Sequence, residues 1–142
     1  MDQPAIVIEK IFKASASKIW KALTNKNEMK KWYFDLAEFK AELGFKFQFV
    51  GGPPDGIQYL HLCEITEAIP NKKLSYSWRY DGNDGISLVS FELIEVGENT
   101  KLILKHSGLE TFPKDNPDFA RHNFEEGWNH IVNISLKGYI EK

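Results

Sequence analysis

The chain has 142 residues, of which 42% are apolar, and its formal net charge at pH 7 is −2. This length predicts one domain over residues 1–142, large enough to bury roughly 68–70% of the surface of the extended chain. The charge argues against a nucleic-acid-binding protein. Only two of the 18 basic residues, Arg79 and Arg121, are arginine, the usual reader of phosphates and guanines.

The cysteine content and the N-terminus bear on the compartment. Cys63 is the single cysteine, which excludes an internal disulfide and fits a reducing environment. The N-terminal residues have neither the basic start nor the apolar region of a signal peptide. No apolar run approaches the ~20 residues of a membrane span. We therefore expect a cytoplasmic protein that does not contact a membrane.

The N-terminal part predicts one strand and two short helices. Ala5 to Phe12 is rich in apolar and β-branched residues, as in a strand. Ser15 is placed to cap a first short helix, which the residues from Thr24 to Asn27 end. A second helical segment is predicted from Glu28. The side chains expected on the inner sides of the two helices are Ile19, Trp20 and Leu23, then Met29, Trp32 and Tyr33.

From Leu36 the apolar period changes to two, which predicts antiparallel strands joined by turns at 51–56, 69–72, 81–85 and 97–99. Residues 58–67 leave two inner faces open, one carrying Leu60 and the other carrying His61. The other side chains expected to face inward are Phe45, Phe47 and Phe49, then Leu74, Tyr76, Trp78 and Tyr80, then Val89, Phe91 and Leu93, and finally Leu102, Leu104 and His106.

The last stretch, Asn116 to Lys142, predicts one long helix. Asn116 is a capping residue, and Pro117 and Asp118 suit a first helical turn. Consecutive strands joined by short turns form a meander, which needs a helix to cover one face. We expect a curved antiparallel sheet of six to seven strands around this helix. Its apolar face, at spacings of three and four, is predicted to comprise Phe124, Trp128, Ile131, Val132, Ser135 and Tyr139.

Five local sequences occur in an order that matches a known family: Ala14 to Thr24, Lys31 to Tyr33, Glu64 to Trp78, Thr100 to Leu109, and Gly127-Trp128. Together they resemble the SRPBCC superfamily of START-related helix-grip proteins. Within it, the chain is similar to the stand-alone bacterial homologues of the activator of heat-shock-protein-90 ATPase. The resemblance implies an α+β helix-grip fold, with two short helices between the first two strands and a hydrophobic cavity between sheet and C-terminal helix.

Two departures limit what the resemblance implies. The Gly-Gly common at the start of the third strand is reduced to Leu43-Gly44-Phe45. The separate N-terminal domain of the eukaryotic co-chaperone is missing, so activation of a heat-shock protein is not carried over.

Metal binding and nucleophilic catalysis find little support in the sequence. His61 and Cys63 share one side of a strand, but no second pair has metal-ligand spacing, and His122 and His130 lie eight residues apart. Cys63 sits mid-strand, where a lone cysteine usually acts as a small hydrophobe. No Gly-x-Ser-x-Gly motif or phosphate-binding glycine loop occurs. We predict no metal, no cofactor and no catalytic residue.

His106 has two interpretations. Its register with Leu102 and Leu104 directs it inward, where it is either a histidine hydrogen-bonded within the core or a polar anchor in an apolar pocket. Aromatic residues on inward faces are usually core, yet a pocket with apolar walls and few polar groups is typical of small-molecule sites. The predicted ligand-binding residues are Trp32, Phe47, Tyr76, Trp78, Phe91, His106, Trp128 and Val132.

The first hypothesis is therefore a protein that binds a small hydrophobic or aromatic molecule in this cavity without a reaction. The second is a cyclase- or dehydratase-like enzyme that performs acid/base chemistry on a polyketide-like or aromatic substrate in the same cavity. The third is a domain that binds a chaperone or another protein partner. A cavity with apolar walls favours the first, several convergent polar groups favour the second, and a solidly filled interior favours the third.

Overall fold

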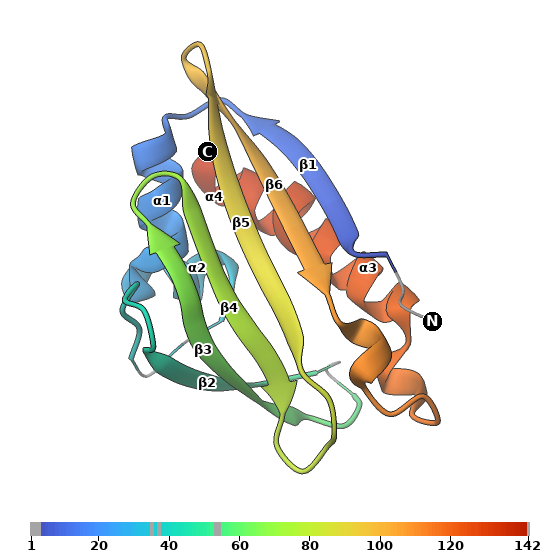
Figure 1. Cartoon of the computed structure of the whole chain (residues 1–142). Helices are drawn as coiled ribbons and strands as arrows, with labels where there is room; N and C mark the ends of the chain where they lie inside the picture. The colour runs from blue at the N-terminus through green and yellow to red at the C-terminus, as the bar shows by residue number, and fades with distance from the viewer. Residues whose placement is uncertain (1–3, 35, 37, 53–54, 142) are drawn as a thin grey trace.

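A six-stranded antiparallel sheet wraps one side of a long C-terminal helix in the computed structural model, which describes residues 4–34, 36, 38–52 and 55–141 (Figure 1). In space the strands follow the order β1-β6-β5-β4-β3-β2, so β1 and β2 are the edges. This confirms the predicted fold class. The strands are β1 (Ile6–Phe12), β2 (Lys46–Gly51), β3 (Tyr59–Ile69), β4 (Lys73–Tyr80), β5 (Ser87–Val96) and β6 (Asn99–Ser107).

The register between β3 and β4 settles which face of β3 turns inward. His61 pairs with Tyr80 and Cys63 with Trp78, and cross-strand partners share a face of the sheet. The face that includes His61 is therefore buried with the inner side chains of β4, and Leu60 and Leu62 belong to the outer face. Phe47 and Phe49 are buried as predicted, and Phe45 is half-buried.

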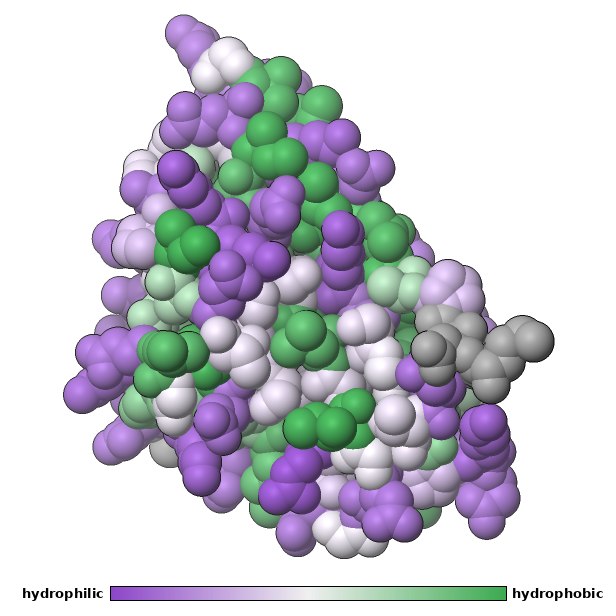
Figure 2. Space-filling model, viewed as in Figure 1, coloured by the Kyte–Doolittle hydropathy of each residue, from purple (hydrophilic) through white to green (hydrophobic). Residues whose placement is uncertain are grey.

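The outer face of the sheet alternates with the inner one and is mainly polar. Figure 2 views this face and shows hydrophobic patches among hydrophilic side chains. The exposed apolar residues of β1 and β5 include Val7, Ile11, Leu88 and Ile94. Charged or polar neighbours separate these residues from one another. Among them are Glu9 of β1 and Lys101 of β6, which form an ion pair with 2.9 Å between Oε1 and Nζ.

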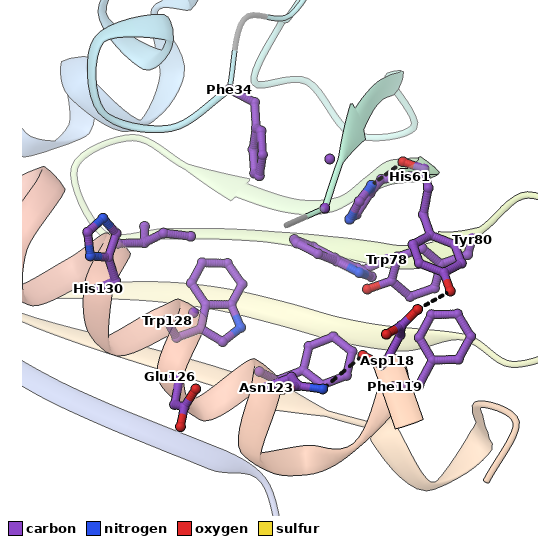
Figure 3. Close-up of a pocket in the computed structure, with 16 residues that line it drawn as sticks. Phe34, His61, Trp78, Tyr80, Asp118, Phe119, Asn123, Glu126, Trp128 and His130 are labelled. Atoms are coloured by element: carbon purple, nitrogen blue, oxygen red, sulfur yellow. Dashed lines mark hydrogen bonds between the residues drawn. The ribbon is translucent and has the colours of Figure 1, made fainter. Parts of the chain in front are cut away.

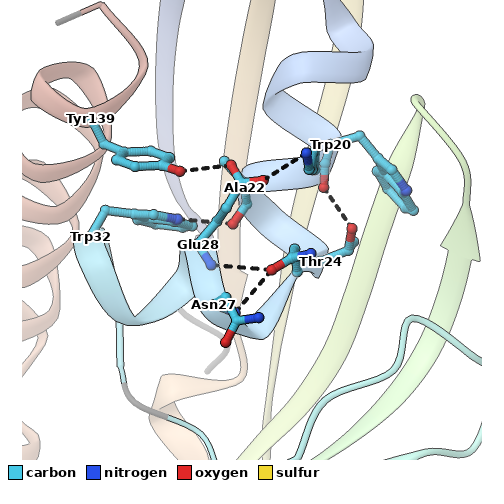
Figure 4. A network of polar contacts seen from close by, with 9 residues as sticks. Trp20, Ala22, Thr24, Asn27, Glu28, Trp32 and Tyr139 are labelled. Carbon is cyan, nitrogen blue, oxygen red and sulfur yellow. Dashed lines mark hydrogen bonds and ion pairs between the residues drawn. The ribbon is translucent and has the colours of Figure 1, made fainter.

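The two short helices, α1 (Ala16–Thr24) and α2 (Lys26–Trp32), form a V between β1 and β2. The break between them is the single residue Asn25, shorter than the predicted 24–27. Asn25 ends α1 and caps α2, since its Oδ1 accepts hydrogen bonds from the backbone of Asn27 and Glu28. Figure 4 shows Trp32 Nε1 donating to the Ala22 carbonyl (2.9 Å) and Tyr139 donating to Glu28 (2.8 Å), which ties the V to the C-terminal helix.

The C-terminal helix begins at Arg121, so the predicted start at Asn116 was wrong. Asn116 does cap a turn, because its Oδ1 accepts from the Asp118 backbone at 2.9 Å, but that turn is a short 3₁₀ helix, Pro117–Phe119. Ala120 is extended and separates the turn from the helix. The helix then comprises α3 (Arg121–His130), a π-helical segment (Ile131–Leu136) and α4 (Lys137–Ile140).

The π-helical segment changes which residues of this helix are buried. The inner face carries Trp128, Val132, Leu136 and Ile140, whereas Ser135 and Tyr139, predicted on that face, are half-buried. An α-helix turns about 100° per residue, so residues twelve apart, such as Trp128 and Ile140, would point about 120° away from each other. A π-helix turns less per residue and brings them back onto one side. None of the helices in the described ranges is long and apolar enough to cross a membrane.

Candidate functional site

A pocket of about 650 Å³ lies between α3 and the ends of β2, β3 and β4 (Figure 3). Two strand-end glycines, an aromatic wall and a polar mouth make up its surface. The residues that line it are Phe34, Gly51, Gly52, Tyr59, His61, Trp78, Tyr80, Asp118, Phe119, Asn123, Phe124, Glu126, Gly127, Trp128, His130 and Ile131.

Cross-strand pairing assembles the wall on the sheet side. The rings of His61 and Phe49 stack at 4.4 Å with an interplanar angle of 17°, and Phe34 stacks on Phe49 at 4.1 Å. Gly51 is needed where β2 passes this stack. A Cβ there would lie 3.1 Å from Phe34 Cε1 and 3.3 Å from His61 Cε1, tighter than ordinary van der Waals contact. The glycine thus lets the backbone approach the rings closely.

The mouth of the pocket is built on the 3₁₀ turn before α3. The Tyr59 hydroxyl donates to Asp118 Oδ2 at 2.6 Å and accepts from Asn116 Nδ2 at 3.2 Å. Asn123 Nδ2 donates to the Pro117 carbonyl at 2.8 Å and so fixes the turn against the first turn of α3. Phe119 stacks on Tyr80 at 4.7 Å. The turn is therefore held to the sheet by polar and aromatic contacts together.

The buried side chains of the lining carry few polar atoms, and these are uncharged. Trp78 is 5% exposed, and its indole Nε1–H is buried without a hydrogen-bond partner among the described residues. The Tyr80 hydroxyl lies close to it without meeting hydrogen-bond geometry. Burial raises the pKa of Tyr80, so its hydroxyl keeps its proton at neutral pH. A buried donor without a partner is costly, and a bound group that accepts from it would recover that cost.

His61 is the one buried histidine that lines the pocket. Burial lowers the pKa of its imidazole to about 4, and the carbonyls of Tyr59 and Phe49 oppose this only in part. The ring is therefore neutral at pH 7. Its Nδ1 lies 3.0 Å from the Tyr59 carbonyl, which only accepts, so Nδ1 carries the proton and Nε2 is the acceptor.

His106 lies behind the pocket wall and is completely buried. Trp128 Nε1 donates to its Nδ1 at 2.8 Å, so the ring proton must be on Nε2, which donates to Ser87 Oγ at 2.8 Å. The Ser87 hydroxyl in turn donates a hydrogen bond to the Trp78 carbonyl at 2.8 Å. Burial lowers the pKa of His106 to about 3. Both ring nitrogens are satisfied within the core, which matches the first of the two interpretations of this histidine.

Of the eight predicted ligand-binding residues, Trp78 and Trp128 line the pocket and the other six do not. Trp32 is buried between α1 and α2, Phe47 packs on Phe39 and Tyr76, and the Tyr76 hydroxyl is 2.7 Å from that of Tyr33. Phe91, His106 and Val132 belong to the core around Trp128. Bulky side chains thus fill the middle of the space between sheet and helix, and the pocket remains near the start of α3.

The sequence interpretation missed most of the lining for identifiable reasons. The alternation in β3 does not distinguish the face of Tyr59 and His61 from the other face, although Tyr80, predicted on the inner face of β4, is the direct partner of His61. Asp118 and Phe119 were expected inside a regular helix. Gly51 and Gly52 were assigned only to a turn. Pairing β3 with β4 by their aromatic residues would have identified His61.

No group of three or more His, Cys, Asp or Glu side chains within the described ranges is arranged to hold a metal ion. Cys63 is buried, and burial raises the pKa of its thiol, so it is held as the protonated form. The arrangement offers stacking surfaces, the indole donor of Trp78, the phenols of Tyr59 and Tyr80, and the imidazole acceptor of His61. These groups suit recognition of a planar molecule by stacking and hydrogen bonding.

Solved structures with the same fold cover almost the whole chain. Protein MLL2253 from Mesorhizobium loti is 26% identical with a TM-score of 0.78, and the match covers 96% of each chain. BH1534 from Bacillus halodurans is 26% identical with a TM-score of 0.75 and 98% of each chain covered. Mll3558 from Rhizobium loti, 18% identical, has a TM-score of 0.83 over 98% of this chain and 97% of that one.

No protein of curated function matches the sequence significantly. Residues 13–141 match the family described as "Activator of Hsp90 ATPase homolog 1-like protein". Since this match spans nearly the whole chain, and the helix-grip structure agrees with it, the chain belongs to the activator of Hsp90 ATPase homolog 1-like family.

Proposed function

We propose that this protein binds a small aromatic molecule in the pocket between α3 and β2, β3 and β4. The observation that carries the proposal is the indole N–H of Trp78, a residue that lines the pocket: this N–H is buried and makes no hydrogen bond of good geometry in the described structure, although the Tyr80 hydroxyl lies close to it. Buried donors are nearly always paired, so an unpaired one beside a cavity points to a missing acceptor. A carbonyl or ether oxygen on the ligand would supply it.

The size and walls of the pocket support a planar ligand. Small-molecule sites typically have volumes of about 300–1,000 Å³ and mostly apolar walls. The 650 Å³ pocket is within this range. Its indole, phenol and phenyl side chains offer stacking faces and edges, and each favourable aromatic pair contributes about 0.5–1.5 kcal/mol beyond the buried area.

Binding without a reaction is the function that we favour. Of the two buried histidines, His106 has both ring nitrogens occupied by Trp128 and Ser87. His61 is neutral, with a pKa lowered to about 4, which makes it a weak base. An acid/base enzyme working near pH 7 is expected to tune such a group toward pH 7 instead.

The test uses a pair of helix glycines. Gly127 lines the pocket, Gly138 lies in α4, and a Cβ added at either position meets no atom within 4 Å. Leucine at an exposed helical position stabilises by roughly 0.5–1 kcal/mol relative to glycine, so both variants should fold at least as well as wild type. We expect Gly127→Leu to occupy part of the pocket and strongly weaken binding, and Gly138→Leu to bind like wild type.

The ligands are 9-fluorenone and fluorene, a matched pair with and without a carbonyl. Binding is followed by the rise in melting temperature and by calorimetric titration. Both should bind wild type, and Trp78→Phe should weaken fluorenone about fivefold to tenfold while changing fluorene little, because a lost hydrogen bond costs about 1 kcal/mol. If neither compound binds, or if Gly127→Leu binds them as wild type does, the proposal fails.

A further inference from the structure

The charges around the pocket restrict the ligand further than its shape does. The lining includes two carboxylates, Asp118 and Glu126, and no lysine or arginine among the described residues. Its buried histidine, His61, is neutral. His130 lies at the other end of the pocket from Asp118 (Figure 3). An anionic ligand would leave water for a site without a basic partner, which is strongly unfavourable.

Hydrogen bonds hold Asp118 in place through one of its two carboxylate oxygens. Its Oδ2 accepts the short hydrogen bond from Tyr59, and its backbone N–H donates to Asn116 Oδ1 at 2.9 Å. Oδ1 has no hydrogen bond or ion pair to any residue that the structure describes. The carboxylate is therefore oriented by neutral groups only, and its charge is not balanced by a cation of the protein.

Aromatic rings lie beside this carboxylate, which is itself exposed. Figure 3 shows Asp118 beside Tyr80 and Phe119 at one end of the pocket. The Tyr59 ring packs on Phe119 at 5.1 Å and on Tyr80 at 5.5 Å. Aromatic faces attract cations, by about 0.5–1 kcal/mol when exposed and about 2 kcal/mol or more when desolvated. Rings next to an unbalanced carboxylate form a favourable environment for an organic ammonium group.

We infer that the ligand of this pocket is an aromatic amine in its cationic form, with the ammonium group at Asp118 and the ring system against Trp78 and Trp128. This rests on the proposed function and adds the charge class of the ligand. An independent observation in favour of a ligand is that Trp78, which lines this pocket, has a buried N–H without a hydrogen bond in the described structure. Glu126 plays a smaller part, because its carboxylate points away from the rings in Figure 3.

The experiment compares three probes with one ring system: 2-naphthylmethylamine, 2-naphthylmethanol and 2-naphthoate. Calorimetric titration at low ionic strength should give the tightest binding for the amine and the weakest for the carboxylate. We expect the amine to bind about fivefold to tenfold more tightly than the alcohol. Added salt should narrow this difference, because the attraction to a partly exposed carboxylate is screened.

Two isosteric variants test which carboxylate is responsible for the tighter binding of the amine. Asp118→Asn keeps an acceptor for Tyr59 and should reduce amine binding to the level of the alcohol without changing the alcohol's affinity. Glu126→Gln removes one negative charge from the α3 side of the pocket lining and should change the amine's affinity by less than about twofold. Equal binding of amine and alcohol by wild type, or tightest binding of 2-naphthoate, would overturn the inference and leave the proposed function standing. Binding of none of the three would overturn both.

Discussion

Two histidines on the inner face of the sheet differ in their hydrogen bonds, although burial lowers the pKa of both. His106 is bonded at both nitrogens by Trp128 and Ser87, which come from the helix and from β5. His61 is bonded at Nδ1 to the Tyr59 carbonyl in its own strand, and the Phe49 carbonyl of β2 also acts on its ring. The first histidine links three elements of the core, and the second leaves an acceptor nitrogen at the pocket.

Both histidines should make the stability of the protein depend on pH. In the unfolded chain a histidine takes up a proton below its usual pKa of about 6.5. In the folded protein His61 takes up this proton only below its pKa of about 4, and His106 only below its pKa of about 3. The unfolded state therefore binds more protons between these limits, and the free energy of unfolding should fall as pH drops from about 6.5 toward 4.

His61 alone should account for about 3 kcal/mol of this loss. Urea denaturation at a series of pH values from 7.5 to 4 measures it. His61→Phe keeps a ring for stacking on Phe49 and should flatten the profile by about that amount. The same pH profile in wild type and His61→Phe would contradict the assignment.

For single residues, the sequence predicted which side chains face inward better than it predicted which residues they contact. The alternation of Leu102, Leu104 and His106 correctly turned His106 inward, because strand geometry is local. Its partners Trp128 and Ser87 lie 22 and 19 residues away, in elements whose approach depends on the packing of the whole chain. The missing hydrogen bond of the Trp78 indole N–H is likewise a property of the packed structure, and no local sequence pattern indicates it.

Among the elements, the C-terminal helix decides where the interior is full and where it is open. Trp128 fills the centre. Its ring centroid lies 5.6 Å from that of Trp78, 5.9 Å from that of Phe91 and 6.3 Å from that of Tyr33. The pocket lies beside the preceding turns. Hydrophobic spacing predicted this helix and its docking face as far as Val132, but not the buried Leu136 and Ile140. It could not predict the start at Arg121, since Asn116, Pro117 and Asp118 suit the first turn of a 3₁₀ or an α-helix equally well.

The π-helical segment of this element should tolerate loss of a residue but not gain of one. Deleting Ile134, which is 62% exposed, would place Trp128 and Ile140 eleven residues apart, about three turns of a regular α-helix. The buried face would persist, and we expect a cost below about 1 kcal/mol. Inserting an alanine after Ile134 would rotate buried Leu136 and Ile140 by about 100°, at a cost of about 3 kcal/mol or more. Chemical denaturation of both variants measures the difference; equal costs would contradict this account.

Across the whole molecule, the two ends of the chain hold each other. Arg121 donates to the carbonyls of Pro4 and Ala5 before β1. At the far end of β1, the Lys13 backbone donates to Glu141 at 3.1 Å, and Lys18 Nζ donates to the Ile140 carbonyl at 2.9 Å. The edge strand β1 is thus fastened to the C-terminal helix at both of its ends.

Removing residues 137–142 should therefore destabilise the entire fold, although the pocket lies elsewhere. The truncation removes Ile140, which is 1% exposed, and the contacts of Lys13 and Lys18. We expect a loss of at least about 3 kcal/mol in the free energy of unfolding, the usual range for a large buried apolar side chain. Tyr139→Phe, which removes the hydrogen bond to Glu28, should cost only about 1 kcal/mol and serves as the comparison. A truncated protein as stable as wild type in urea would contradict this.

The π-helical segment also has a consequence for the lengths of homologous sequences. Insertions usually survive in loops, where no packing depends on the phase of the chain. Within a docked helix, a single added residue is tolerated only if it is taken up locally, and a π-helical segment such as Ile131–Leu136 can do this. Homologues with a regular helix should then be one residue shorter between the counterparts of Trp128 and Ile140. Their alignment to this chain should place a one-residue gap inside the helix.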